Sequence, residues 1–342
     1  MAKNSIFVAL LAFCCWFPAR ADHITGGEMY YRFISSANNV NHYQVTLKLF
    51  MRCNSGRQFA NPTYVSVFDR SSFARVTDLS IPLSRTEHLE LNDAGPCVTN
   101  PPPVCYEVGY YEFTVDLPSN AGGYILASQV NFRIAGISNL QSNYGLIGAL
   151  YSTEIPGTSV GASAVANNSA HFTGSDLVVV CASNAFNYSF AANDGDGDEL
   201  RYYFCDAYQS SGSFGGGGNN STPPDPPPFP KVPYNTPYYA GYGPLGGQVQ
   251  INSSTGEISG IAPPEGIYVV TVCVDEIRNG KVIATQRKDL QINVADCSIA
   301  SASLLQDYML CDSSFRLAIS NLSNSPLIQT QQWEISSSDG RL

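Results

Sequence analysis

The chain has 342 residues, ten of them cysteine, a formal charge of −10, 13% charged residues and 11% aromatic residues. An acidic balance argues against nucleic-acid binding, which needs a basic face. Low charge combined with 20 tyrosines and 29 glycines favours an exported β protein over a helical bundle.

The N-terminus has the three parts of a secretory signal peptide over residues 1–21. Lys3 provides a basic start, Ile6–Phe17 is a short apolar core, and Ala19-Arg20-Ala21 is an A-x-A cleavage pattern. The apolar core is shorter than the about 20 residues that span a bilayer, and no later part of the sequence is apolar over that length. We therefore expect a secreted or cell-surface protein with no transmembrane segment after removal of the signal.

Strand patterns follow from residue 22 to about residue 165. Apolar and polar residues alternate in Tyr43–Leu49, which is the period of a strand with one buried face. Turn-forming clusters such as Ser36–Asn41 separate such runs. Residues 22–165 are predicted to form one N-terminal β domain. Its predicted strands are Glu28–Ile34, His42–Arg52, Tyr64–Asp69, Tyr106–Asp116 and Gly123–Phe132.

A second set of short strands occupies residues 166–296 and predicts an immunoglobulin-like or cadherin-like sandwich. The predicted strands are Leu177–Cys181, Asn187–Ala191, Leu200–Cys205, Gln248–Ile251, Tyr268–Asp275 and Lys281–Val294. A Gly-, Pro- and Tyr-rich insertion, residues 210–247, interrupts this set; it is either a surface loop or a contact surface that offers tyrosines. Residues 297–342 are predicted to begin a further, incomplete domain of a longer product. The predicted fold class is thus all-β, with tandem sandwich domains.

Eight cysteines remain after signal removal, and an even number in an exported chain predicts disulfides. Cys97 and Cys105 flank Pro101–Pro103 and are predicted to close a local loop. Cys205 and Cys273 lie in two predicted strands and form the second predicted pair. The pairing of the others stays open: Cys53, Cys181, Cys297 and Cys311. There is no C-x-x-C pair, so zinc has little support.

An acidic cluster, Asn193–Leu200, holds the strongest candidate for a metal site. Asp194, Asp196 and Asp198 alternate with glycines, and carboxylate oxygens on a tightly turning backbone suit a calcium ion. The position that should carry an EF-hand glutamate is Cys205, so that motif is excluded. Asp275, at the end of a later predicted strand, is the expected fourth ligand. The sequence predicts a calcium site at these four residues; an acidic turn without metal is the alternative.

Evidence for catalysis is weak. The four histidines lie outside any H-E-x-x-H pattern, and neither a G-x-S-x-G elbow nor a phosphate-binding glycine loop occurs. Glu107 and Glu112 could serve as the acid and the base of a glycoside hydrolase, but scattered carboxylates in a β protein are mostly solvated. We expect no catalytic residues and no enzyme activity.

A family resemblance is carried by several short motifs. The stretch Asp22–Tyr31 resembles the "H-I-x-G-G-E-x-x-Y" opening of large exported proteins of Bacteroidota associated with gliding motility and type IX secretion. Leu47–Cys53 resembles their strand ending in "R-D-C", Ala192–Leu200 is similar to the "A-x-D-x-D-G-D-x-L" of cadherin-like modules, and Cys273–Gly280 resembles "C-V-x-E-x-R-N-G". The double cysteine that these proteins carry near the position of Gln129 is missing, and their C-terminal sorting domain would need sequence beyond Leu342.

The resemblance implies an outer-membrane-associated or secreted protein with repeated PKD or cadherin-like domains. The function expected is a non-catalytic, adhesin-like protein in gliding motility or surface attachment, stabilised by calcium. Its partner would be a surface polymer, a glycan or another cell-surface protein. The alternatives are a carbohydrate-binding module for polysaccharide capture and, third, a glycoside hydrolase.

Overall fold

The computed structural model describes residues 24–91, 98–99, 104–131, 133–134, 136–141, 147–178, 180–210, 221–239, 243–296 and 298–299, with a few further positions between 304 and 334. The predicted signal peptide and most of the predicted third domain lie outside these residues. The described chain is nearly all β, which confirms the all-β part of the predicted fold class. No helix in the described ranges is long and apolar enough to cross a membrane.

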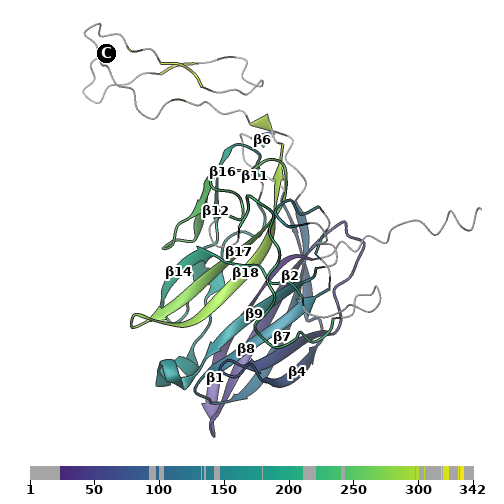
Figure 1. Ribbon diagram of the computed structural model, residues 1–342, viewed down its shortest axis with the longest axis vertical. Coiled ribbons are helices and arrows are strands. Elements are labelled where there is room, and N and C mark those ends of the chain that lie inside the picture. The colour runs from purple at the N-terminus through teal and green to yellow at the C-terminus, as the bar shows by residue number, and fades with distance from the viewer. Residues whose placement is uncertain are drawn as a thin grey trace, which may run out of the picture.

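An eight-stranded sheet forms the centre of the molecule (Figure 1), with strands in the order β14-β17-β18-β1-β2-β7-β5 and β11 beside β18. The neighbouring strands along this path are antiparallel, and β11 is parallel to β18. The strands are β14 (Glu199–Phe204), β17 (Gly266–Arg278), β18 (Lys281–Ala295), β1 (Ile24–Ala37), β2 (Val40–Arg52), β7 (Cys105–Pro118), β5 (Arg85–Glu90) and β11 (Val180–Cys181).

Smaller sheets accompany this central sheet. One has the order β4-β3-β8-β9, a second β12-β16-β15, and two-stranded pairs join β10 to β13 and β19 to β6. Their bounds are β4 (Arg75–Ile81), β3 (Thr63–Asp69), β8 (Gly123–Val130), β9 (Ala149–Pro156), β12 (Ala185–Ser189), β16 (Glu257–Ile261), β15 (Val249–Ile251), β10 (His171–Phe172), β13 (Ala192–Asn193), β19 (Ser298–Ile299) and β6 (Val98–Thr99). Two short 3-10 helices, η2 (Thr158–Val160) and η3 (Ala162–Ala166), follow β9.

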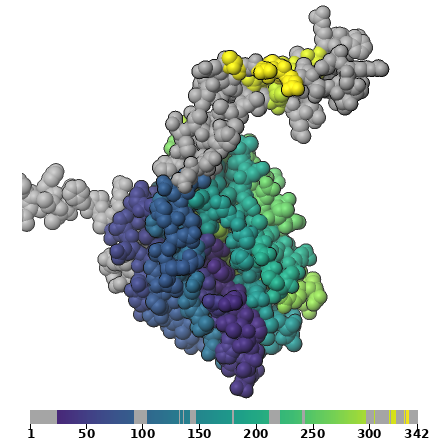
Figure 2. Space-filling view, turned by 180° about the vertical axis from the view of Figure 1, so that it is seen from behind, coloured from purple at the N-terminus to yellow at the C-terminus, as the bar shows by residue number. Residues whose placement is uncertain are grey.

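The two predicted domains share the central sheet. Glu28 of β1 is paired with Lys48 of β2 on one side and with Lys288 of β18 on the other. Figure 2 shows the blue N-terminal half and the teal-to-green second half packed against each other along the body. The predicted boundary near residue 165 is therefore wrong as a domain boundary, because the pairing of β1 with β18 joins strands more than 250 residues apart, which local patterns do not reveal.

Alternating side chains of the central sheet build a separate core on each face, as the period of a strand requires. On β2, Leu47, Leu49 and Met51 are buried in a core with the β4-β3-β8-β9 sheet. Phe50 points into the opposite core, which contains Tyr188 of β12 and other residues of the second half. Burial on both faces explains why β1 and β2 are covered over most of their length.

Two adjacent glycines allow β1 to lie in the middle of this stack. A Cβ at Gly26 would collide with the carbonyl oxygen of Asp289 on β18. A Cβ at Gly27 would lie 2.8 Å from the carbonyl oxygen of Lys48 and 2.9 Å from the Tyr151 ring of β9. The Gly-Gly of the opening motif thus has a physical role, since only a residue without a side chain fits between these strands.

The Gly-, Pro- and Tyr-rich insertion packs on the body over residues 221–239. Phe229 is buried and makes edge contacts with the rings of Phe68 on β3 and Tyr208, at centroid distances of 6.2 and 5.5 Å. Tyr238 packs on the buried ring of Tyr268 at 5.5 Å. Tyr239 is 45% exposed. This part of the insertion is therefore a docked segment that contributes to a surface, and its tyrosines do not all face solvent.

Candidate functional site

The acidic cluster folds into a turn between β13 and β14. One carboxylate oxygen of Asp194 accepts hydrogen bonds from the backbone N–H groups of Asp196 (2.9 Å) and Asp198 (3.0 Å). Gly197 has a φ of 79°, a conformation that favours glycine. The D-x-D-G-D spacing therefore encodes the turn itself, with Asp194 as the residue that closes it.

Arg278, at the end of β17, carries the positive charge of this cluster. Its guanidinium donates to both carboxylate oxygens of Asp198, at 2.7 and 2.6 Å, and contacts Asp196 at 3.2 Å. It also donates to the side-chain oxygen of Asn167 at 2.6 Å. Forked contacts of this kind are among the strongest charge-assisted hydrogen bonds. An arginine thus pairs with two of the three aspartates.

Asp275 does not join the cluster, although it was the expected fourth ligand. Its carboxylate accepts hydrogen bonds from Arg201 (2.7 Å), Tyr203 (3.0 Å) and Thr285 (2.8 Å). Adjacent residues of a strand point to opposite faces, so the neighbouring Glu276 takes the position toward the turn. The predicted ligand set is corrected in this respect.

Glu276 is completely buried beside the turn. It accepts hydrogen bonds from the side chains of Asn167 (2.5 Å) and Gln286 (2.9 Å) and from the backbone N–H of Ala170 (2.8 Å). Burial raises the pKa of Glu276 to about 7, despite these three donors. The pKa of Asp194 is also raised, mainly by burial.

A cation could be held by Asp194, Asp198 and Glu276, which each offer an oxygen atom within 4.8 Å of the others. The second carboxylate oxygen of Asp194 is buried and has no hydrogen-bond partner. These are hard oxygen donors of the kind that calcium prefers. Because Arg278 already engages Asp198, a calcium ion would have to displace that guanidinium.

Two disulfides are defined by both partners in the described residues. Cys205 of the β14 end is bonded to Cys273 of β17, as predicted. Cys105 is bonded to Cys53, so the predicted local Cys97–Cys105 pair is wrong. The end of β2 lies beside the start of β7 in the sheet, where Arg52 is paired with Tyr106, and this brings Cys53 to Cys105. Cys97 lies outside the described residues; Cys181 is disulfide-bonded as well.

A second cluster of potential metal ligands combines Cys53, His88 and Cys105. Both sulfur atoms belong to the disulfide, so neither is a thiolate, the form that binds metals. His88 is exposed and lies 2.6 Å from Glu107, whose hydrogen bond raises the pKa of the imidazole. This arrangement is a surface ion pair beside a cross-link.

A groove of about 430 Å³ lies next to the Cys205–Cys273 disulfide. The residues that line it come from the β3–β4 turn, β8, β9, β14 and the segment after it, the docked insertion, β17 and β18. Its aromatic residues are Phe73, Tyr203, Tyr208 and Phe229. A volume of this size falls in the range of small-ligand pockets, in which apolar walls carry a few placed polar groups.

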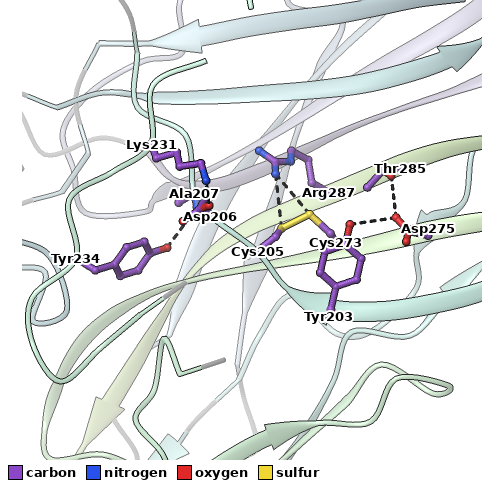
Figure 3. Close-up of a disulfide and its surroundings, with 10 residues drawn as sticks. All are labelled: Tyr203, Cys205, Asp206, Ala207, Lys231, Tyr234, Cys273, Asp275, Thr285 and Arg287. Carbon is purple, nitrogen blue, oxygen red and sulfur yellow. Dashed lines mark hydrogen bonds and ion pairs between the residues drawn. A yellow bond between two sulfur atoms is a disulfide. The ribbon is translucent and has the colours of Figure 1, made fainter. Parts of the chain in front are cut away.

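Arg287 connects the disulfide to the aromatic wall of this groove. Figure 3 shows its guanidinium directed at both sulfur atoms, 3.4 Å from Cys273 and 3.6 Å from Cys205. The same group stacks on the ring of Tyr208, 3.7 Å from the centroid. One nitrogen, Nη1, is buried and has no hydrogen-bond partner. This donor is unused within the described residues.

The other charged groups of the groove are paired. Lys231 and Asp206 form an ion pair at 2.5 Å (Figure 3), and Glu154 is bound to Arg70 at 2.7 Å. Burial raises the pKa of Glu154. The walls therefore carry both signs of charge, and the groove as a whole does not favour a strongly charged ligand.

Phe73 stands at the rim of the groove in an unusual backbone conformation. Its φ is 58°, in the left-handed region that bulky residues rarely adopt, and its side chain is 39% exposed. The residue lies in the turn that joins β3 to β4, where its N–H donates to the carbonyl of Asp69 at 2.8 Å. An exposed aromatic ring held in a strained conformation beside a groove is a candidate ligand contact. Nothing in the sequence signals it, because local patterns do not reveal a positive φ at phenylalanine.

The Glu107–Glu112 pair cannot flank one glycosidic bond. Both residues lie on β7, whose register with β2 runs without a shift from Glu107 to Glu112. Five residues along a strand place the two side chains on opposite faces and about 17 Å apart. Paired catalytic carboxylates are about 5–10 Å apart on the same cleft.

Comparison with known proteins identified no relative of this chain. The chain matches no family model, no curated protein and no solved structure.

Proposed function

We propose that this chain is a non-catalytic, exported, adhesin-like protein that binds a glycan strand in the groove beside Cys205–Cys273. The observation that carries the proposal is Phe73, an exposed ring with a φ of 58° at the rim of an aromatic groove of about 430 Å³. The disulfides support an oxidising, extracellular location, where such bonds form and persist. A role in surface attachment or gliding motility is the proposed setting.

A neutral or weakly charged sugar fits the chemistry of the groove. Sugar rings have apolar faces that pack on aromatic side chains, and the groove offers the rings of Phe73, Tyr203 and Tyr208. Sugar hydroxyls need hydrogen-bond partners, and Arg287 is a hydrogen-bond donor among the residues that line the groove. The combination of apolar walls with few polar groups is the usual form of a small-molecule site.

A glycan array with the mature protein, followed by calorimetry on each hit, tests this function. We expect binding of at least one polysaccharide, loss of that binding in Arg287→Met, and unchanged binding in Tyr239→Ala, whose ring is 45% exposed outside the groove. Circular dichroism checks that each variant is folded. An array without hits, or equal binding by Arg287→Met, would contradict the proposal. The absence of new reducing ends after incubation with the bound polysaccharide would agree with the non-catalytic assignment.

Calcium is the proposed cofactor, held by Asp194, Asp198 and Glu276 in competition with Arg278. The unpartnered oxygen of Asp194 and the short separation of the three carboxylates support this ligand set. Calorimetry with calcium, after treatment with a chelator, should detect binding that Asp198→Asn removes. If calcium gives no heat of binding and does not shift the melting temperature, calcium is not a cofactor of this protein. The proposal for the groove would be unaffected by that result.

A further inference from the structure

Four charged side chains are buried together between the central sheet and the layer that covers it. Glu28 of β1 lies between Lys48 of β2 and Lys288 of β18, because it is the register partner of both. Asp176 reaches them from the segment that follows β10. The exposed fractions of the four side chains are 3% for Glu28, 14% for Lys48, 2% for Lys288 and 9% for Asp176.

The contacts place one carboxylate between two ammonium groups. Nζ of Lys288 donates to Oδ1 of Asp176, and Nζ of Lys48 donates to Oδ2 at 2.6 Å. Oε1 of Glu28 lies 3.8 Å from the Lys288 nitrogen and 3.7 Å from the Lys48 nitrogen. An amine, a carboxyl group and a second carboxyl group are thus held in reach of one another by three different elements.

The surroundings of this cluster are aromatic. The Lys288 nitrogen is 5.6 Å from the centre of the Phe50 ring and 5.8 Å from that of Phe172. Both rings belong to the buried core on this face of the sheet. Removing charges from water is costly even when they are paired, so a reaction that converts a buried ion pair into a neutral group is favoured here.

We propose that Lys288 and Asp176 join in an intramolecular amide bond. The Nζ of Lys288, as the free amine, attacks Cγ of Asp176 in its protonated form. The new C–N bond forms, the bond from Cγ to Oδ1 breaks, and Oδ1 leaves as water. The ammonium and the carboxylate of the starting pair together contain all atoms of the amide and the water, so no oxidant or other reactant is needed.

The neighbouring groups fit distinct roles in this reaction. Lys48 stays an ammonium, since Glu28 and Asp176 raise its pKa more than burial lowers it, and it donates to Oδ2, the oxygen on which negative charge develops. The two lysines lower the pKa of Asp176 against the effect of burial, so the proton on its carboxyl must come from Lys288 itself. Glu28, whose Oε1 lies 3.8 Å from the Lys288 nitrogen, is the carboxylate that would accept a proton from the attacking amine. Afterwards Lys48 and Glu28 remain as a balanced pair.

Lys288 is assigned over Lys48 because it is the more buried amine, at 2% against 14% exposure. The charge with less access to water gains most by becoming neutral. The bond would tie the segment after β10 to the central sheet across a separation of 112 residues.

Mass spectrometry of the mature protein tests the proposal. After reduction of the disulfides, the intact chain should be lighter than its calculated mass by one water, and a tryptic digest should contain the Asp176 peptide linked to the Lys288 peptide. Loss of water by cyclisation at Asp196-Gly197 is distinguished from this because it links no peptides. An intact chain at its full calculated mass would overturn the proposal, and a link to Lys48 would overturn the assignment to Lys288.

Matched controls test whether the amide bond requires burial of the pair and not only the proximity of its two side chains. Lys231 and Asp206 form an equally close pair, but the lysine is 65% exposed, so their peptides should stay unlinked. Glu28→Gln keeps the shape of the proton carrier and should leave the folded chain at its full mass, as should Lys288→Met. Complete cross-linking in a folded Glu28→Gln variant would contradict the role given to Glu28.

Discussion

Removal of the Cys205–Cys273 disulfide should cost this protein much of its stability. The two cysteines are 68 residues apart, and a cross-link over that separation lowers the entropy of the unfolded chain by an amount worth about 4.4 kcal/mol at 25 °C. The Cys53–Cys105 bond spans 52 residues, for which the same relation predicts about 4.1 kcal/mol. Since folded domains are typically stable by about 5–15 kcal/mol, either loss is a large fraction.

The double variant Cys205→Ala/Cys273→Ala is the suitable test, because alanine introduces no hydroxyl into a site where Cys273 is buried. Urea unfolding followed by far-ultraviolet circular dichroism gives the free energy by linear extrapolation. We expect a loss of about 4 kcal/mol, and a similar loss for Cys53→Ala/Cys105→Ala. Losses of less than about 1 kcal/mol for both variants would refute the reasoning from chain entropy.

Three further changes have defined outcomes. Gly27→Ala should lower the free energy of unfolding by about 1–3 kcal/mol, measured by urea unfolding, because the methyl group would collide with the backbone of β2; an unchanged value would contradict the close approach. Arg133→Met should cost about 3–5 kcal/mol in the same assay, since it leaves Asp289 charged and 5% exposed without its 2.6 Å partner; a neutral effect would show that other groups compensate. Arg278→Met should bind calcium more tightly than the wild type in calorimetry because the competing guanidinium is gone; weaker binding would exclude competition.

Local alternation was sufficient to predict the strands with one or two well-buried faces. His42–Arg52 and Tyr64–Asp69 correspond closely to β2 and β3. The edge strands β4 and β5 were missed because most of their residues are exposed and polar, so that no apolar period is visible. Strand β9 was also missed. Almost every one of its residues is buried, so burial does not alternate from one residue to the next.

Long-range pairing was beyond local patterns. The pairing of β1 with β18 depends on Gly26, which lies against the backbone of a strand that is distant in the sequence, while Gly27 lies against β2 and β9. The sequence motif contains the two glycines but does not identify their partner. For that reason two domains were expected where one central sheet runs through both halves.

The acidic turn was found by its spacing, but the residues that complete it were not. Asp194 and Asp198 lie four positions apart in a turn that glycine makes recognisable. Arg278 comes from another strand 80 residues later, and Glu276 differs from the expected Asp275 by one position. The sequence of β17 did contain a signal for both residues. Val272 and Val274 alternate along the strand with residues of the other face, and the same alternation places Glu276 and Arg278 on the face of the two valines.

Substitution of Phe73 by glycine tests the proposed function most directly. Glycine adopts a φ of 58° without strain, so Phe73→Gly should be at least as stable as the wild type in urea unfolding. In calorimetry with the polysaccharide identified on the array, the same variant should bind at least tenfold more weakly, a difference of about 1.4 kcal/mol. Unchanged affinity in this folded variant would contradict the claim that the aromatic groove is the binding site.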